Sequence, residues 1–474
     1  MISQPFLFSF PMTFESPDGT DLYAPALWAR ESLIILQENM VAAANVKKSF
    51  SNEIARFGDT VNTRRPTIIS TTRKTPNQAV TETGTDATPV KIVLNQHVYN
   101  SFLIYDATRA KSFKDLVTEF IHPAAIGMAE QIDRTVLSMT NQIVMTNRVG
   151  QLQSITPSNA RALLVSARQA LNTQKAPDTN ERVMIWGSSA ESQVLNSDLF
   201  VKALERGDGG RALDRGAIGH VFGMMNHLDQ NISSVSPLFP QVATGTITGS
   251  IAAGATGSQT CVISGYSVVV GSFATVAGDA NPKEISARTF STNTTAITFT
   301  QPMDNATVAT AGVTVYKPFT FDVGYAAGYT NEVLLDGNAG NPPQIGQGIA
   351  TGTTGGANRA IYTAVAVTAV TSTQWSVLLD RPLDNAVSSS DPAFPMPAGG
   401  YNLAMHPDAF ALISRPLPMV MEGLGAKTAV ADVNGLGMRI TMAYDSSLQA
   451  MRVTMDILLG IAILNANLAV CVQS

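Results

Sequence analysis

The sequence predicts an α+β protein whose mixed body of helices and strands is interrupted by an inserted all-β region. Apolar residues recur at helical spacing between residues 112 and 145. From residue 237 to 397 this pattern is absent, and short runs rich in Gly, Thr, Ala, Ser and Val replace it. Mixed patterning returns at Tyr401. Because 474 residues exceed what one hydrophobic core normally serves, we expect several domains.

The composition limits the classes of function. Charged residues make up only 14% of the chain, so we expect much of the surface to be covered by something other than water. The net charge of −5 disfavours tight binding of nucleic acid as the main function. Two cysteines are too few for a disulfide framework, which fits a reducing compartment. No secretion signal or membrane span is expected, since the longest apolar run, 457–472, is short and interrupted by asparagines.

Residues 1–59 are predicted to form an N-terminal arm. Within them, residues 21–51 carry a helical pattern with little else to pack against locally; its apolar positions are Leu33, Leu36, Met40 and Ala44. The helix could dock on another body or on its own domain, and the sequence leaves both open.

Residues 60–106 are predicted to form a long β-hairpin, with extended segments at 60–74 and 90–106 joined by polar turn residues. The first segment carries four positive charges and no acidic residue: Arg64, Arg65, Arg73 and Lys74. A lone two-stranded ribbon is marginally stable in water, so we expect it to lie on a neighbouring molecule and to contact acidic groups there. The alternative is a solvated charged hairpin.

Residues 107–156 contain the predicted spine helix. Ser112 and Asp115 form a helix start signal, and Pro123 suits the first turn of a second helix of about 34 Å that runs to residue 145. Its apolar stripe is Ile121, Ala125, Met128, Ile132, Val136, Met139 and Ile143. Met128, Ile132, Val136 and Met139 are its predicted core. The polar residues expected on other faces are Glu130, Gln131, Asp133, Arg134, Asn141 and Gln142.

Residues 157–236 are predicted to form a compact mixed domain. An amphipathic helix at 157–174 precedes a strand at 182–188, a helical piece at 188–205 and a glycine-marked strand within 211–232.

The inserted region, 237–397, carries an internal repeat. TFTQPMDNA (298–306) and LLDRPLDNA (378–386) are each a strand followed by the same turn, with their prolines 80 residues apart. Two tandem β-modules of roughly 80 residues explain the repeat, and a chance match of turns is the alternative. Residues 398–474 then complete the first body.

No catalytic, metal or cofactor site is predicted. The five histidines sit in separate elements, without HExxH spacing or a Cys/His cluster. Gly346, Gly348 and Gly352 lie in a loop without the flanking strand and helix that a phosphate site needs. No spacing pairs two acidic residues as a catalytic couple.

Several packing motifs resemble the major capsid protein of tailed double-stranded-DNA bacteriophages, in the branch that carries an inserted β-domain. In chain order the motifs are GDTVNTRRPT (58–67), HPAAIGMAEQIDRTVL (122–137), GAIGHVFGMMNHLDQNI (216–232), NLAMHPDAFALISRPLP (402–418) and RVTMDILLGIAILNANLAVCV (452–472), with a weaker echo in GDANPKE (278–284).

The resemblance implies a fold with an N-terminal arm, an extended loop, a peripheral domain holding the spine helix (107–156) and an axial domain that begins at 157–236, with residues 398–474 completing the axial and peripheral domains. It implies a structural protein, not an enzyme, that forms hexamers and pentamers of an icosahedral shell around double-stranded DNA, without sequence-specific binding. It also implies assembly in the host cytoplasm into a virion, with a portal and a scaffolding protein. Two features depart from the family: two β-modules instead of one, and no N-terminal scaffold segment for a protease to remove. Scaffolding is therefore expected from a separate protein.

Two other functions remain open. A bacterial nanocompartment shell of the same fold would enclose a cargo enzyme, although the large β-insertion disfavours it. A hydrolase or carbohydrate-binding protein would use the β-region as a binding module.

Overall fold

The structure is a computed structural model of the 474-residue chain. It describes residues 25–48, 60–65, 73, 88–106, 120–143, 147–150, 155–178, 181–197, 218–232, 234–235, 241–247, 250–254, 258–263, 268–279, 283–291, 294–299, 303, 305–316, 318–328, 332–337, 342–352, 360–396, 399–419, 426–433 and 435–473. The predicted helix start at Ser112 and Asp115 lies outside these residues.

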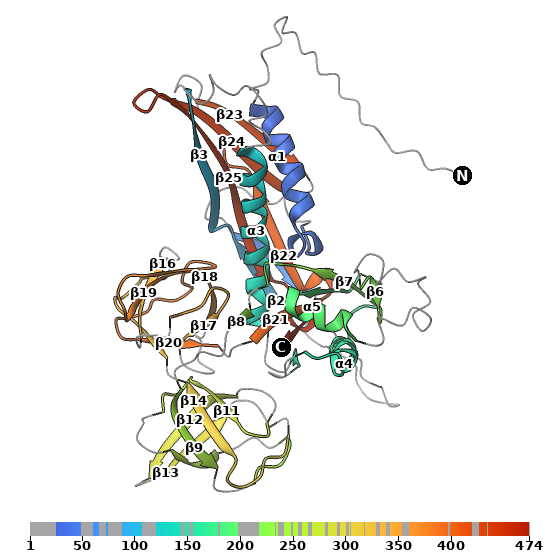
Figure 1. The fold of residues 1–474 in the computed structure, drawn as a ribbon, viewed down its shortest axis with the longest axis vertical. Helices are drawn as coiled ribbons and strands as arrows, with labels where there is room; N and C mark the ends of the chain where they lie inside the picture. The colour runs from blue at the N-terminus through green and yellow to red at the C-terminus, as the bar shows by residue number, and fades with distance from the viewer. Residues whose placement is uncertain are drawn as a thin grey trace, which may run out of the picture.

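The chain is an α+β protein whose long upper part is a five-stranded antiparallel sheet (Figure 1). The strands are β3 (Gln96–Tyr105), β22 (Phe410–Arg415), β23 (Ala426–Val433), β24 (Leu436–Asp445) and β25 (Ala450–Ile463). The 14-residue β25 is central: β3 pairs along one edge, and β24 and β22 pair with successive parts of the other. Two helices, α1 (Pro25–Asn39) and α3 (His122–Ser138), lie against this sheet (Figure 1).

The spine helix is α3, and Pro123 lies in its first turn. The apolar stripe is buried along its whole length, from Ile121 to Ile143. The helix ends earlier than predicted, at Ser138, and tightens into a 3₁₀ turn, η5 (Met139–Gln142). Near its end, the hydroxyls of Thr135 and Ser138 donate to the carbonyls of Gln131 and Thr135, and such side-chain bonds compete with the helical ladder.

Two polar residues of the spine correct the prediction that they face away from the core. Asp133 is fully buried and Asn141 is 3% exposed. Each is buried because another element supplies hydrogen-bond partners for it: residues 41–43 for Asp133 and Thr363 for Asn141.

The part of the predicted arm that the structure describes belongs to the body of the same chain. Trp28, Leu33 and Leu36 of α1 are buried in one core cluster with Met128 and Ile132 of α3 and with apolar residues of β23 and β24. Of the two possibilities left open by the sequence, α1 therefore docks on its own domain. Residues 1–24 and 49–59 lie outside the described part of the chain.

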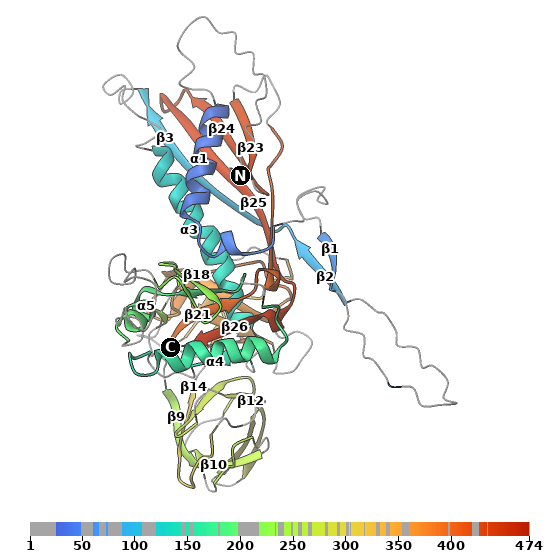
Figure 2. The ribbon, with the colours of Figure 1, turned by 90° about the vertical axis from the view of Figure 1, so that its right-hand side faces the viewer.

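The predicted hairpin is shorter than expected. Strand β1 (Thr60–Arg65) pairs with β2 (Thr88–Val93), whereas β3, predicted to be the far half of the hairpin, pairs with β25. The alternation that predicted an extended strand also explains this placement. Val98, Phe102 and Ile104 turn the same face of β3 toward the core, where the ring of Phe102 stacks on Phe120. In Figure 2 the β1–β2 pair stands away from the rest of the molecule; we call this pair the ribbon.

The second part of the body is built on a seven-stranded mixed sheet. Its strands are β4 (Arg148–Val149), β5 (Val183–Trp186), β6 (His220–Val221), β7 (Met224–Leu228), β8 (Ser234–Val235), β21 (Gly399–Met405) and β26 (Ala469–Gln473). Helices α4 (Ala160–Thr173) and α5 (Ser188–Leu195) pack on it through residues such as Leu164, Leu171 and Val194. Gly223, with φ of 74°, makes the turn between β6 and β7.

The inserted region consists of two closed six-stranded barrels (Figures 1 and 2). Barrel 1 contains β9 (Gln241–Ile247), β10 (Ser258–Ile263), β11 (Phe273–Val276), β12 (Lys283–Ser291), β13 (Thr294–Phe299) and β14 (Gly312–Tyr316). Barrel 2 contains β15 (Phe319–Phe321), β16 (Glu332–Asp336), β17 (Gly348–Thr351), β18 (Ala360–Ala369), β19 (Gln374–Leu379) and β20 (Pro392–Pro395). The chain leaves and rejoins the body at one place, because Val235 in β8 pairs with Gly399 in β21.

Candidate assembly surfaces

The ribbon forms a two-stranded sheet of its own. Of the four predicted cations, Arg64 and Arg65 lie at the end of β1, in register with Pro89 and Thr88. Arg73 lies beyond the strand and is exposed, and Lys74 lies outside the described residues. The four charges therefore do not all sit on the first strand, because β1 ends at Arg65.

The base of the ribbon packs against the body through buried apolar residues. Ile92 and Leu94 are fully buried in a small cluster with Ile413 of β22 and Leu458 of β25. The backbone there passes so close to β25 that a Cβ on Gly460 would lie 2.6 Å from the carbonyl oxygen of Val93. Glycine at this position therefore permits the crossing. A projecting element on a buried base suits a contact with another molecule.

Asp133 fastens the turn after α1 to the spine helix. Its Oδ2 accepts the N–H of Val41 at 2.7 Å, and its Oδ1 accepts the N–H of Ala43 at 2.8 Å, at the start of the short 3₁₀ helix η2 (Ala43–Asn45). Backbone donors at and before the start of a helix have no partner within it, so the carboxylate satisfies them.

The electrostatic environment of Asp133 is unusual for a carboxyl group. Burial raises its pKa to about 7, while the backbone donors of Val41 and Ala43 oppose the shift and the nearby Asp229 adds to it. Burial also raises the pKa of Asp229, against hydrogen bonds from Asn231. Lys48 lies near Asp133, and burial lowers the pKa of its ammonium group although Asp133 opposes that shift. The junction of α1, α3 and the β7 loop thus holds two carboxyl groups.

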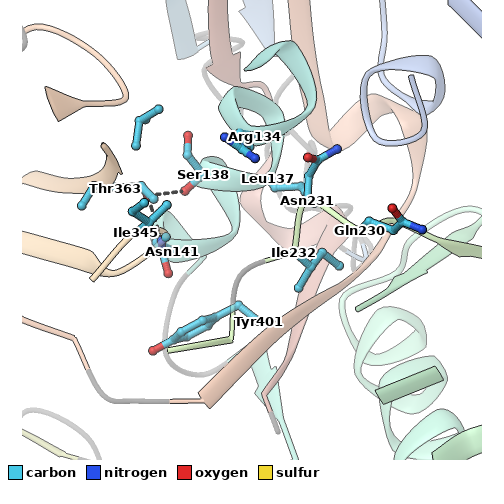
Figure 3. A pocket seen from close by; sticks show the side chains of 13 residues that line it. Arg134, Leu137, Ser138, Asn141, Gln230, Asn231, Ile232, Ile345, Thr363 and Tyr401 are labelled. Atoms are coloured by element: carbon cyan, nitrogen blue, oxygen red, sulfur yellow. Dashed lines mark hydrogen bonds between the residues drawn. The ribbon is translucent and has the colours of Figure 1, made fainter. Parts of the chain in front are cut away.

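Barrel 2 is attached to the end of the spine helix through polar side chains (Figure 3). The one proton of Ser138 Oγ is shared between the Thr135 carbonyl, at 2.6 Å, and Asp380 Oδ2, at 3.0 Å, and Asn141 Nδ2 donates to Thr363 Oγ1 at 2.8 Å. The Thr363 hydroxyl in turn donates to the carbonyl of Ser138 at 3.3 Å, and its backbone N–H donates to Asp380 at 2.8 Å. We call these four residues, Ser138, Asn141, Thr363 and Asp380, the clamp.

The charge of Asp380 is balanced within barrel 2. Its carboxylate is fully buried and accepts Arg381 at 3.1 Å, while the Arg381 guanidinium lies 4.5 Å from the centre of the Tyr362 ring. Burial raises the pKa of Asp380, and Arg381 opposes that shift. A buried pair of this kind is costly to break from one side, so Arg381 holds the Asp380 carboxylate in place as an acceptor for Ser138.

A cavity of about 160 Å³ lies beside the clamp, between α3, the segment after β7 and barrel 2. The residues that line it include Arg134, Asn141, Asn231, Ile345, Thr363 and Tyr401 (Figure 3). The described residues that line it include no His, Cys, Asp, Glu or Lys. Within the described residues, no group of three or more His, Cys, Asp or Glu side chains could hold a metal ion. Among the same residues, no helix is both long and apolar enough to cross a membrane.

The structure places the predicted spine residues in one core. Met128, Ile132, Val136 and Met139 are each at most 2% exposed, in the cluster that also holds α1 and the long sheet. Sequence reasoning missed Asp133 and the clamp. One signal was available for Asp380: the repeated turns read Thr-Gln-Pro in the first copy and Asp-Arg-Pro in the second, and the Asp of the second copy meets the spine.

The sequence matches no protein-family model and no curated protein. Similar solved structures include three from bacteriophages. A structure of Mycobacterium phage Che8 has 11% sequence identity and a TM-score of 0.43, over 91% of this chain and 90% of that one. The capsid structure of the cyanophage P-SCSP1u has 10% identity and a TM-score of 0.42, over 89% and 84%. The asymmetric unit of the bacteriophage PhiM1 mature capsid has 10% identity and a TM-score of 0.38, over 100% and 92%.

Proposed function

We propose that the chain is a structural subunit that self-assembles into the icosahedral head shell enclosing a phage genome. The observation that carries this proposal is the ribbon: a two-stranded sheet that stands off the body on a buried base (Figure 2). A free ribbon is marginally stable in water, so a neighbouring copy is the surface that would support it.

The rest of the geometry suits a shell subunit. The spine helix and the long sheet form an extended body with its core spread along its length, which lets one subunit touch several neighbours. Closed symmetry then turns many modest contacts into a stable cage. The low charged fraction of 14% agrees with extensive burial between copies.

The proposal includes the partners that the sequence resemblance implies. Copies would form hexamers and pentamers, guided by a separate scaffolding protein and joined to a portal, and the product would be a virion assembled in the host cytoplasm. With a net charge of −5, the subunit would enclose double-stranded DNA without gripping a specific sequence.

The second candidate is a nanocompartment shell of the same fold, which would use the ribbon in the same way. The two differ in their contents. Particles should be purified from infected or expressing cells, treated with nuclease and protease, and then opened. Protected DNA supports the head shell, and a folded protein cargo without DNA supports the nanocompartment. A chain that stays monomeric at high concentration, with and without scaffolding protein, contradicts both.

A further inference from the structure

The two barrels are two copies of one fold. Counted around each barrel, the strand orders are β9-β10-β13-β12-β11-β14 and β15-β16-β19-β18-β17-β20, which are identical after a shift of six strands. The repeated turn is held the same way in both: the N–H of Gly254 donates to Met303, and that of Gly328 to Leu383, each at 2.7 Å.

Smaller details of the two copies also coincide. Thr310 and Ser390 occupy the same unusual backbone region, with φ of 72° and 69°. The β12–β13 and β18–β19 pairs carry a bulge at the same point, between Ile285 and Ala287 and between Ala364 and Ala366. The shared irregularities mark a duplicated module, because regular strand pairing alone would not require them.

The copies differ in what they touch. Barrel 2 meets the spine through the clamp residues Thr363 and Asp380. By the register of the bulges, the position of Thr363 is Glu284 in barrel 1, and the repeated turn places Thr300 where barrel 2 has Asp380. Barrel 1 thus carries a different pair of residues at the positions that barrel 2 uses to hold the helix.

Barrel 1 packs instead on barrel 2, through an apolar junction. Phe273 on the outside of β11 meets Ala350 of β17, Phe394 of β20 and Met396 just after β20, all at most 2% exposed. At the equivalent outward positions barrel 1 carries Thr275, Thr314 and Tyr316, and Tyr316 packs, partly buried, against the same junction. Barrel 2 is therefore the more apolar of the two copies at these positions.

The path of the chain also separates the two copies. Barrel 2 is the copy that returns to the body, since β20 ends at Pro395 and β21 begins at Gly399. Both ribbon views place barrel 1 at the end of the molecule far from α1 and the long sheet (Figures 1 and 2). Removing barrel 1 would leave residues 236–240 and 317–318 to connect β8 with β15. Seven residues span up to about 25 Å when extended.

We propose that the two copies have divided their roles: barrel 2 is a brace that fixes the C-terminal end of the spine helix, and barrel 1 is an added module that neither subunit folding nor assembly requires. The part that concerns assembly rests on the proposed function; the part that concerns folding does not.

The test deletes residues 241–316 from the full chain and inserts four Gly/Ser residues at the junction. Phe394→Thr is included, so that the uncovered face of barrel 2 takes the residue found at Thr314 of barrel 1. We expect a soluble subunit whose apparent Tm lies within about 3 °C of the parent protein. Hydrogen exchange at residues 132–142 should be as slow as in the parent. An unfolded variant, or faster exchange at the end of α3, overturns the proposal.

Point variants in the full chain test the brace without a deletion. Asp380→Asn removes one of the two carboxylates that pair with Arg381, the other being Asp384, and we expect the apparent Tm to fall by at least about 5 °C with faster exchange at residues 138–142. The matched control is Asp336→Asn, a half-buried carboxylate of barrel 2 that accepts Gln374 and does not face the spine. It should leave exchange at α3 unchanged. If both variants lower the apparent Tm and speed exchange at α3 equally, the role proposed for barrel 2 is wrong.

Assembly is scored last, by electron microscopy. If the parent protein forms closed particles and the deletion variant does not, barrel 1 is needed for the shell and that half of the proposal is wrong. If the parent forms no particles, the proposed function fails, while the exchange and melting results still decide the division between the barrels.

Discussion

Asp133 in the spine helix accepts the backbone N–H of Ala43 at 2.8 Å, across 90 residues of sequence. This bond, together with the one from Val41, joins the turn after α1 to α3. One carboxyl group therefore adds two hydrogen bonds to the apolar packing between the two helices. Its strength depends on pH, because burial raises the pKa of Asp133 from 3.8 to about 7.

The first prediction concerns the pH dependence of stability. A raised pKa means that the folded state holds the proton more tightly than the unfolded state does. The resulting stabilisation is complete below about pH 4 and is lost as the pH rises to about 7, by up to about 4 kcal/mol. Asp133→Asn removes the titration but leaves one acceptor oxygen for the two N–H donors, so the variant should be less stable than the parent at pH 4 and should lose less stability as the pH rises. Urea unfolding at intervals from pH 4 to 8 measures the difference.

The control is Glu130→Gln, an exposed position on the same helix, which should follow the pH profile of the parent. Parallel profiles for the parent and Asp133→Asn would show that the carboxyl group does not titrate in this range.

The second prediction concerns the spine core. Met128→Asp or Ile132→Asp would bury an unpaired carboxylate at a position that is at most 2% exposed, a change that costs several kcal/mol. We expect insoluble subunits. Ile126→Asp, at a position of α3 that is 37% exposed, should remain soluble and folded. Soluble, assembly-competent protein from Ile132→Asp is incompatible with the core described here.

The third prediction concerns the base of the ribbon. Gly460→Ala places a methyl group against the Val93 carbonyl, where backbone must shift, and should lower the free energy of unfolding by about 1–3 kcal/mol. Gly127→Ala is the matched control, since a Cβ there meets nothing within 4 Å and alanine favours the helix. Chemical denaturation of both variants measures the difference, and equal stabilities would argue against the close crossing.

The fourth prediction concerns the ribbon cations. Arg64→Glu combined with Arg65→Glu should leave the circular dichroism and melting of the isolated subunit unchanged and should reduce the yield of closed particles. The change reverses charge on an element that we expect to meet acidic groups of a neighbour. The control combines Arg161→Glu on α4 with Lys175→Glu just after it, two exposed positions away from the ribbon. Normal assembly by the Arg64/Arg65 variant would show that these residues are not part of the interface between copies.

The sequence predicted those helices and modules whose pattern is visible in residues close together in the chain. The stripe from Ile121 to Ile143 located the spine helix, because helical period is visible within a few turns. The turns at Pro302 and Pro382 indicated two modules, and two barrels occupy that region. That each module closes on itself depends on pairings between distant strands, such as β9 with β14, which no local pattern encodes.

Contacts between segments far apart in the sequence explain why β3 and Asp133 were placed wrongly and why the clamp was not predicted. The sequence placed β3 in the hairpin because the nearest strand was the simplest partner, yet Ser101 pairs with Thr454. Asp133 was assigned to an outer face because hydropathy records polarity and not the presence of a buried donor. The clamp was missed for the same reason, since Ser138 and Asp380 meet only in the folded chain.

The most direct test of the shell is a density map of the purified protein at high concentration, at a resolution that separates subunits. We predict closed particles in which the ribbon of each copy, residues 60–65 paired with 88–93, lies against the body of a neighbouring copy. Particles in which the ribbon faces solvent, or a chain that remains monomeric with its scaffolding protein present, would contradict the account.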